Sequence, residues 1–344
     1  MSTFHELKIK DLEKLTNDSI AVTFNVPSEL KNNFDFYSGQ YVTLEVLING
    51  NKIRRSYSIC SSPLESLKIG IKKLKGGLFS SNAIKSFKKG ETVKVSTPEG
   101  KFYYKGDQKK EIVTGIAAGS GITPILSIAK SVLNKDNNNK FRLIFGNKSK
   151  LDEMFSNDLV KLKSKFNDRF ILINVYSRSN EMNGLYGRID NSIINYYIKN
   201  YGKANKYFIC GPEEMIHKLS DKLISSGISK TNIFFELFKT KKIDPSTSTK
   251  NTTSTIEIVY DDVIYKIKNP NGKTILDAAL DSKIDVPYSC QGGVCSSCIA
   301  KLISGNVTMH NNQILTDKEI NDGLILACQS KSKDDYLKID FDDV

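Results

Sequence analysis

The chain has 344 residues, of which 39% are hydrophobic and 26% are charged, which is ordinary for a soluble protein with room for two or three domains of about 100–200 residues each. No secretory signal is expected, because MSTFHELKIKDLEK lacks an apolar core. The uncharged run 112–129 contains three glycines and a proline, and we interpret it as a strand, a loop and a helix rather than a membrane span. Six cysteines without a disulfide pattern suit a reducing cytoplasm.

The formal net charge of +12 is unevenly distributed. Residues 254–344 carry nine Lys/Arg and fourteen Asp/Glu, whereas residues 1–253 carry 41 and 24. The lysines of the basic part are scattered and no aromatic-rich basic motif accompanies them, so we expect no nucleic-acid partner. Attraction of an anionic small molecule explains the basic charge better.

Residues 1–107 are predicted to form an antiparallel β-barrel, because short strand patterns such as SIAVTFNV and YVTLEVLI alternate with turn residues. One of these segments contains Arg55, Tyr57 and Ser58. An arginine, an aromatic ring and a hydroxyl on one strand face could respectively bind a phosphate, lie against a flat ring and donate to a ring nitrogen. Taken alone, the segment fits an ordinary surface strand equally well.

A second candidate site in the barrel is the sequence GGLFSS, with Gly76, Gly77 and Ser81, before the expected helix SSNAIKSF. Glycines followed by a helix start, with serine as the N-cap, can bind an anion through backbone N–H groups and the helix dipole. The alternative is a simple turn and helix cap.

Residues 108–238 are predicted to form an α/β domain with a parallel sheet. The strand patterns EIVTGIAAGSG, FRLIFGN, FILINVYS and KYFICGP are each followed by a plausible helix, and such sheets bind ligands at the carboxyl ends of their strands. The loop after the first strand contains Gly119, Ser120 and Thr123, whose small side chains would admit a pyrophosphate, with Pro124 in the first helical turn. It is not a G-x-G-x-x-G fingerprint, so the loop alone does not establish a dinucleotide site.

Two further strand ends of this domain are candidate binding positions. Ser177 and Arg178 end one strand, where the arginine could hold a ribose 2′-phosphate or simply be a solvated loop residue. Cys210, Gly211 and Pro212 end another. Cys210 could be a small buried filler, but its place at a strand end favours the binding crevice.

Residues 239–253 are predicted to be a linker, since they are polar and lack apolar periodicity. Residues 254–344 are predicted to form an α+β domain. Cys290, Cys295 and Cys298 have the spacing C-x4-C-x2-C, and Cys328 is a distant fourth, the arrangement of a plant-type [2Fe–2S] cluster. Structural zinc, the alternative, usually takes two C-x2-C-like pairs, and no histidine lies nearby.

In order along the chain, RSYS, GGLFSS, AAGSGITP and CGPEEM resemble the ferredoxin–NADP reductase superfamily, and PYSCQGGVCSSC with LACQS resembles a fused plant-type ferredoxin. The combination is most similar to reductases of the phenylacetyl-CoA epoxidase type, which belong to bacterial multicomponent oxygenases. The resemblance covers essentially the whole chain. Two departures are the linker and Leu237, where arginine is expected.

The resemblance implies a fold of three parts: a flavin barrel, a nucleotide domain and a [2Fe–2S] domain. It places Arg55, Tyr57 and Ser58 on the flavin ring system, and FAD is favoured over FMN because the GGLFSS turn offers a second phosphate subsite. The other implied contacts are Gly76, Gly77 and Ser81 to the FAD phosphates, Gly119, Ser120, Thr123, Ser177, Arg178, Gly211 and Pro212 to the nicotinamide dinucleotide, Cys210 beside the nicotinamide ring, and Phe238 beside the flavin.

Tyr57, Ser58 and Cys210 are therefore the expected catalytic residues. The implied function is transfer of electrons from NADPH, or alternatively NADH, through FAD and the [2Fe–2S] cluster to an oxygenase or other electron-acceptor protein, because flavin can take a hydride and release single electrons. Alternatives are a reductase serving another oxygenase or a desaturase, and a non-catalytic metal-binding partner module. We expect no membrane partner.

Overall fold

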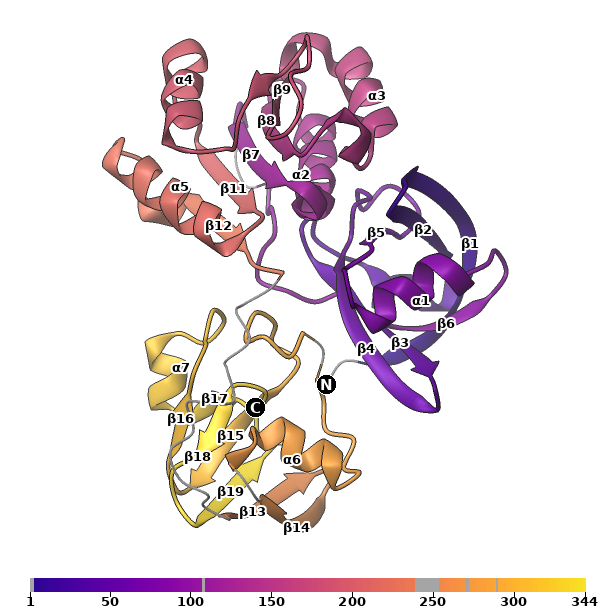
Figure 1. Ribbon diagram of the computed structural model, residues 1–344, viewed down its shortest axis with the longest axis vertical. Coiled ribbons are helices and arrows are strands. Elements are labelled where there is room, and N and C mark those ends of the chain that lie inside the picture. The colour runs from indigo at the N-terminus through magenta and orange to yellow at the C-terminus, as the bar shows by residue number, and fades with distance from the viewer. Residues whose placement is uncertain (1–2, 107–108, 239–253, 270–271, 289) are drawn as a thin grey trace. The chain divides into compact units, whose positions relative to one another are not determined.

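The computed structural model describes residues 3–106, 109–238, 254–269, 272–288 and 290–344 (Figure 1). Thr3–Phe238 form one compact unit, and the rest of the described chain forms a second. The predicted linker, 239–253, lies outside the described residues. No helix in the described part of the chain has the length and apolar character needed to cross a membrane.

The first part of the chain forms a six-stranded antiparallel sheet in the order β4-β3-β6-β1-β2-β5. Its elements are β1 (Phe4–Thr16), β2 (Ser19–Asn25), a 3₁₀ turn (Ser28–Phe34), β3 (Tyr41–Ile48), β4 (Asn51–Ser58), β5 (Lys68–Lys72), α1 (Leu78–Ser86) and β6 (Thr92–Ser96). A bridge between Ile59, just after β4, and Ile69 in β5 joins the two outer strands. The predicted antiparallel barrel is therefore confirmed, with alternate strand residues such as Leu7, Ile9 and Val22 in its core.

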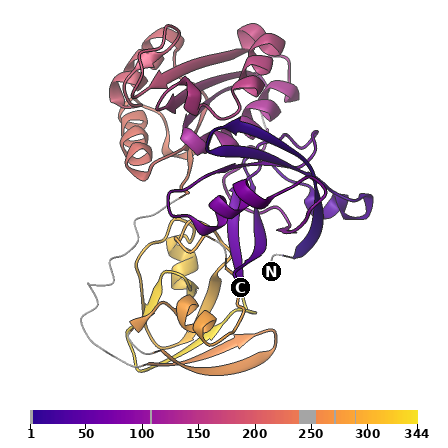
Figure 2. The ribbon, with the colours of Figure 1, turned by 45° about the vertical axis from the view of Figure 1, so that its right-hand side comes forward.

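The next part is a parallel sheet in the order β10-β9-β8-β7-β11-β12, as predicted. The elements are β7 (Ile112–Ala118), α2 (Ile122–Lys135), β8 (Lys140–Asn147), α3 (Ser156–Phe166), β9 (Phe170–Tyr176), β10 (Leu185–Tyr186), α4 (Asn191–Tyr201), β11 (Lys206–Cys210), α5 (Glu213–Ser225) and β12 (Ile233–Glu236). Helices α2 and α3 cover one face, and α4 and α5 the other (Figure 1 and Figure 2). The strand order reverses between β7 and β11, so the carboxyl ends of these two strands border the expected ligand crevice.

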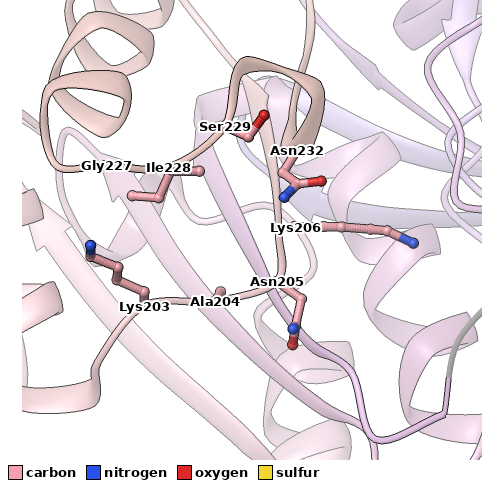
Figure 3. Close-up of a pocket in the computed structure, with 8 residues that line it drawn as sticks. All are labelled: Lys203, Ala204, Asn205, Lys206, Gly227, Ile228, Ser229 and Asn232. Carbon is pink, nitrogen blue, oxygen red and sulfur yellow. The ribbon is translucent and has the colours of Figure 1, made fainter.

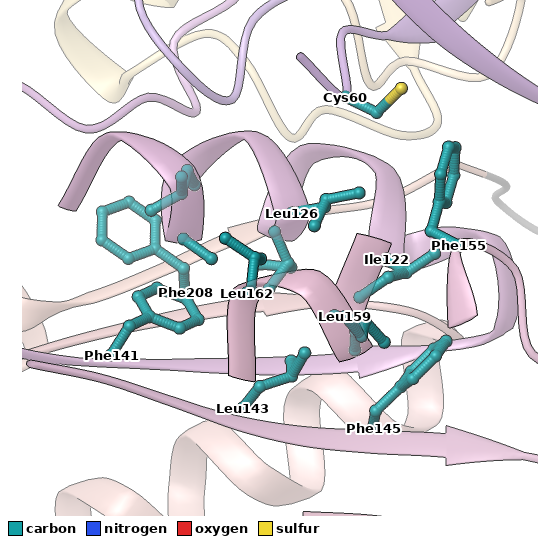
Figure 4. Close-up of a cluster of buried hydrophobic side chains, with 14 of the residues drawn as sticks. Cys60, Ile122, Leu126, Phe141, Leu143, Phe145, Phe155, Leu159, Leu162 and Phe208 are labelled. Carbon is teal, nitrogen blue, oxygen red and sulfur yellow. The ribbon is translucent and has the colours of Figure 1, made fainter. Parts of the chain in front are cut away.

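Helix α2 is buried on almost every side because it packs between this sheet and the barrel. Its apolar side belongs to a core that includes Leu143, Phe145 and Leu159, and Cys60 of the barrel contributes to the same core (Figure 4). The core therefore extends from the sheet into the barrel.

Polar contacts on α2 join these two parts of the first unit. Ser127 donates to the backbone oxygen of Ser61 at 2.6 Å. The buried Lys130 ammonium lies 3.2 Å from Glu65 of the barrel and 3.4 Å from Asp158 of α3. Burial alone would lower the pKa of Lys130, but the charges of Glu65 and Asp158 outweigh it and raise the pKa. Lys130 is thus charged and paired with a residue of the barrel on one side and of α3 on the other.

The second unit contains a five-stranded mixed sheet in the order β14-β13-β19-β15-β17 and a two-stranded sheet of β16 and β18. Its elements are β13 (Ser254–Tyr260), β14 (Val263–Asn269), α6 (Ile275–Asp281), β15 (Ile299–Ser304), β16 (Val307–Met309), α7 (Asp317–Asn321), β17 (Leu324–Leu326), β18 (Ser330–Ser332) and β19 (Tyr336–Asp340). Thr274 caps α6 by accepting from the Asp277 backbone N–H. The segment with the first three cysteines lies between α6 and β15, and Cys328 lies between β17 and β18.

Candidate functional site

Three side chains from separate segments meet at the carboxyl ends of β11 and β12, beside the end of β4. Cys210 ends β11 and is the register partner of Glu236, which ends β12. The hydroxyl of Ser58, the last residue of β4, donates to the Glu236 carboxylate at 3.1 Å. The barrel thereby contributes a hydroxyl directly to the ligand-binding edge of the parallel sheet.

Burial raises the pKa of Glu236 from 4.5 to about 8, although the hydrogen bond from Ser58 opposes the shift. Burial, reinforced by the Glu236 charge, also raises the pKa of Cys210 well above its ordinary value. At neutral pH the group therefore consists of a protonated carboxyl, a neutral thiol and a hydroxyl. Such a site can hold or exchange a proton without presenting a fixed charge.

Glu236 was not among the residues predicted from the sequence. The signal that could have identified it is a single carboxylate at the end of the short apolar strand IFFE, because that strand continues the parallel sheet beyond β11. Phe238, which was predicted, lies two residues further on and is 39% exposed, whereas the intervening Leu237 is buried.

The barrel residues predicted to contact the flavin do not all share one strand face. Side chains alternate along β4, so Arg55 and Tyr57 lie on one face and Ser58 does not. The expectation of three functions on a single face is therefore wrong, although the three remain in one strand. The Tyr57 ring lies 5.6 Å from that of Phe79, and burial raises the pKa of its hydroxyl.

The turn before α1 differs from the prediction in detail. Helix α1 begins at Leu78, and its N-cap is Gly77 without a side-chain cap bond, so the expected serine cap is wrong. Ser81 lies inside the helix, where its N–H donates to the Gly77 oxygen. Gly76 has φ +73°, and a Cβ atom there would meet nothing within 4 Å, so the backbone before the helix is open to a ligand.

The loop between β7 and α2 is shaped by close backbone packing. A Cβ atom on Gly121 would lie 2.2 Å from the Cys210 oxygen, so only glycine lets the loop approach the end of β11. Gly119 has φ +55° and open space around it. Thr123 is buried, and its hydroxyl donates to the Ser120 oxygen at 3.0 Å, so it shapes the loop. Pro124 lies in the first turn of α2, as predicted.

At the far side of the same sheet edge, Ser177 and Arg178 directly follow β9. Their backbone N–H groups donate to the oxygens of Asn147 and Lys148. Four buried side-chain atoms near this edge have no hydrogen-bond partner among the described residues. They are Nδ2 and Oδ1 of Asn147, Oδ1 of Asn174 and Oγ of Ser179. Buried polar groups normally have partners, so these atoms are exceptions within the described part of the chain. Gly211 and Pro212 lie nearer the centre, and Pro212 is the N-cap of α5.

A pocket of about 270 Å³ opens at the opposite edge of the sheet, lined by Lys203, Ala204, Asn205, Lys206, Gly227, Ile228, Ser229 and Asn232 (Figure 3). Lys206 is the first residue of β11 and Cys210 the last, so the pocket lies about 13 Å from the crevice at 3.3 Å per residue. Ligands of parallel sheets bind at the carboxyl edge. We therefore do not assign this pocket to the active site.

In the second unit, the four cysteines come together around one loop. Cys290 lies close to Cys295 and Cys328, and Cys328 also lies close to Cys298. Donation from the two neighbouring thiols lowers the pKa of Cys290. Backbone N–H groups also point at sulfur: that of Gly292 lies 3.3 Å from Cys290 Sγ, and that of Cys290 lies 3.4 Å from Cys295 Sγ.

Four sulfur donors, two of which have a backbone N–H group directed at them, fit an iron–sulfur cluster. No group of three or more His, Cys, Asp or Glu side chains in the described ranges is spaced as the ligands of one metal ion. The assignment of a two-iron cluster to these cysteines is therefore supported by the four sulfur donors and by the backbone N–H groups that point at two of them.

Comparison with known proteins assigns a class to each part of the chain. The oxidoreductase FAD-binding domain family matches residues 6–104, the oxidoreductase NAD-binding domain family residues 116–221, and the 2Fe-2S iron-sulfur cluster binding domain family residues 259–333. The chain is therefore an NAD(P)H-dependent oxidoreductase that uses FAD and a [2Fe–2S] cluster.

Two relatives and one solved structure match this chain over almost its whole length. The chain is 34% identical to the E component of the 1,2-phenylacetyl-CoA epoxidase of Escherichia coli (strain K12) over 99% of both chains. It is 29% identical to the ferredoxin reductase component of the 3-ketosteroid-9-alpha-monooxygenase of Rhodococcus rhodochrous, over 97% of this chain and 96% of the relative. The crystal structure of phthalate dioxygenase reductase has the same fold, with a TM-score of 0.65, 24% identity and 98% coverage of both chains.

The chain belongs to the family of oxygenase reductases in which ferredoxin–NADP reductase modules precede a C-terminal [2Fe–2S] domain. Its function is electron transfer from NAD(P)H through FAD and the cluster to an oxygenase.

Proposed function

We propose that this chain is the NADPH-dependent reductase of an oxygenase of the phenylacetyl-CoA epoxidase type. The main support for the proposal is the 34% identity to the E component of the E. coli epoxidase over 99% of both chains. The proposed division of the chain is a flavin domain at 1–107, a nucleotide domain at 108–238, a linker at 239–253 and a cluster domain at 254–344.

In this proposal, bound FAD would supply the change from a two-electron hydride transfer to single-electron transfers toward the [2Fe–2S] cluster. Arg55, Tyr57 and Ser58 contact the flavin ring system, and the N–H groups at the start of α1, after Gly76 and Gly77, bind its phosphates. Ser81 faces the same turn from inside the helix, and Phe238 packs beside the flavin.

The nicotinamide dinucleotide binds across the ends of β7, β9 and β11. Gly119 and Ser120 admit the pyrophosphate, and Thr123 keeps their loop in shape. Gly211 and Pro212 border the nicotinamide end. Ser177 and Arg178 hold a 2′-phosphate, which is the reason to favour NADPH over NADH.

The residues around the transferred hydride act through their protonation states. Ser58 holds the Glu236 carboxyl in place through the 3.1 Å hydrogen bond, and Glu236 keeps its proton up to about pH 8. The neutral Cys210 thiol fills the strand end without adding charge. Together these groups give the nicotinamide a packed, uncharged site that excludes water.

Cys290, Cys295, Cys298 and Cys328 hold the cluster. The N–H groups directed at Cys290 and Cys295 stabilise negative charge on the sulfurs and so favour thiolate ligation.

The proposal is tested by using this chain in place of the E component in purified E. coli phenylacetyl-CoA epoxidase. NADPH oxidation coupled to consumption of phenylacetyl-CoA, lost in the Cys295→Ser variant, supports the assignment. A chain that reduces an artificial acceptor normally but leaves phenylacetyl-CoA unchanged contradicts it.

A second candidate partner is the oxygenase of a 3-ketosteroid-9-alpha-monooxygenase, favoured by the 29% identity to its reductase component over 97% of this chain. The same replacement with that oxygenase and a 3-ketosteroid distinguishes the two. Turnover with the ketosteroid enzyme and none with the epoxidase would replace the first assignment.

A further inference from the structure

Gln329, the residue after the fourth cysteine, has a buried side chain whose amide has three neighbours at the cluster site. Its amide nitrogen lies 3.1 Å from the Gln291 backbone oxygen, 2.9 Å from the Cys328 backbone oxygen and 3.6 Å from Cys328 Sγ. Only 7% of the residue is exposed. Two of these neighbours are carbonyl oxygens, which can only accept, so the end of the amide that faces them must be the NH₂ group. Its two hydrogens serve three acceptors, so the hydrogen that reaches Cys328 Sγ is shared with a carbonyl oxygen.

The loop that carries the first three cysteines is shaped to fit this side chain. Gln291 has φ +54° and Gly293 has φ +74°, and a Cβ atom on Gly293 would lie 2.9 Å from Gln329 Cγ. The Gln329 backbone is also anchored, since its oxygen accepts from the His310 N–H at 3.0 Å. Gln329 therefore connects the remote fourth cysteine to the loop immediately after Cys290.

The contact with Cys328 Sγ has a consequence for the redox chemistry of the site. Reduction of an iron–sulfur cluster adds negative charge that is shared with its ligand sulfurs, and an N–H group directed at such a sulfur stabilises the reduced form. The burial of Gln329 keeps water from replacing the amide in this position.

We propose that Gln329 is a positioning residue that raises the reduction potential of the [2Fe–2S] cluster by donating to Cys328 Sγ and closes the cysteine loop onto the fourth ligand. This inference rests on the proposed ligation of the cluster by the four cysteines. The inference adds to the four cysteines a fifth side chain, that of Gln329, which determines how readily the cluster accepts an electron from the flavin.

The test is an EPR-monitored redox titration of the intact chain and of the Gln329→Leu variant, which has a similar volume and no N–H donor. The expected result is a more negative midpoint potential in the variant at unchanged flavin potential. Gln313→Leu is the matched control, because Gln313 is exposed and its amide is 3.5 Å from Asn311 Oδ1; its cluster potential should equal that of the wild type. An unchanged potential in Gln329→Leu would overturn the inference.

A second measurement uses the wild-type protein, so that it gives a result even if Gln329→Leu does not retain the cluster. In reduced wild-type protein labelled with ¹⁵N at the glutamine side-chain amides, pulsed EPR should detect a ¹⁵N nucleus coupled to the cluster, and this coupling should persist in Gln313→Leu. Its absence in wild type would overturn the inference. Iron and acid-labile sulfide per flavin are measured first, since wild-type protein without a cluster would instead contradict the proposed cysteine ligation.

Discussion

The proposed cluster site and the proposed hydride-transfer site are built in different ways. Three of the four cysteines lie within nine consecutive residues, from Cys290 to Cys298, and only Cys328 is remote. Ser58, Cys210 and Glu236 instead come from three strands and span the barrel and the parallel sheet. A cluster needs closely spaced sulfurs and can be bound by one loop, whereas a site between two large planar cofactors must take its walls from two domains.

This difference predicts that the two sites can be damaged separately, and the largest effect is expected at the cluster. Cys295→Ser should abolish cluster absorbance and electron transfer to an acceptor protein, because a buried ligand is lost, while NADPH still reduces the flavin. Visible spectra and stopped-flow reduction measure the two activities. Cys60→Ser is the matched control, since Cys60 is buried in the first unit. Undiminished transfer to the acceptor in Cys295→Ser would show that the cluster is not on the electron path.

The nucleotide site can be altered alone by Arg178→Ala. A charge-assisted hydrogen bond contributes about 1.5–3 kcal/mol, so the KM for NADPH should rise by about tenfold or more. The KM for NADH should change little, because NADH lacks the 2′-phosphate. Steady-state kinetics with both donors measure the ratio, and Lys161→Ala, on the exposed surface of α3, controls for the loss of one positive charge. Equal changes for the two donors would remove the 2′-phosphate role from Arg178.

The junction between the barrel and the sheet can be weakened without touching either site. Lys130→Met keeps the apolar stem but leaves Glu65 and Asp158 without their shared cation. Because both carboxylates are partly exposed, we expect a loss of about 2 kcal/mol and a decrease in Tm of roughly 5 °C for the first unit. Calorimetry measures the Tm of the first unit, and absorbance recorded over the same temperatures follows the cluster. If the cluster absorbance were lost in the same thermal transition that unfolds the first unit, the two units would not unfold independently.

The last prediction concerns the protonation of Glu236 and is seen only as a dependence of stability on pH. Its folded pKa of about 8 lies above the ordinary value of 4.5, so the folded state binds more protons than the unfolded state between these values. Relative to Glu236→Gln, wild-type stability should therefore be greatest below pH 4.5, fall as the pH rises toward 8 and level off above it. Tm differences between the two proteins from pH 5 to 9 measure this; a constant difference would mean that Glu236 has no raised pKa.

Much of the fold follows from local patterns in the sequence. The strands SIAVTFNV and YVTLEVLI and the change to alternating strands and helices depend on neighbours within a few residues. The N-terminus of α1 was misplaced because GGLFSS offers two serines as caps, and the helix instead begins after Gly77. Nothing in the sequence of the turn distinguishes a helix capped by one of the serines from a helix that begins after Gly77.

The candidate site was only partly predictable for the same reason. Ser58 and Cys210 lie in recognisable segments, but Glu236 gains its role from pairing with Cys210 across the sheet and from the hydroxyl of a distant strand. Gln329 is similar, since its importance comes from contacts with Gln291, 38 residues earlier in the chain. Partnerships between remote segments require the tertiary structure.

The relay of electrons from NADPH through FAD to the cluster is tested most directly by anaerobic titration of the purified chain with NADPH while visible spectra are recorded. We predict bleaching of the flavin bands accompanied by loss of the oxidised-cluster absorbance, with both reduced when donor is in excess. A fully reduced flavin beside a cluster that stays oxidised would contradict the relay.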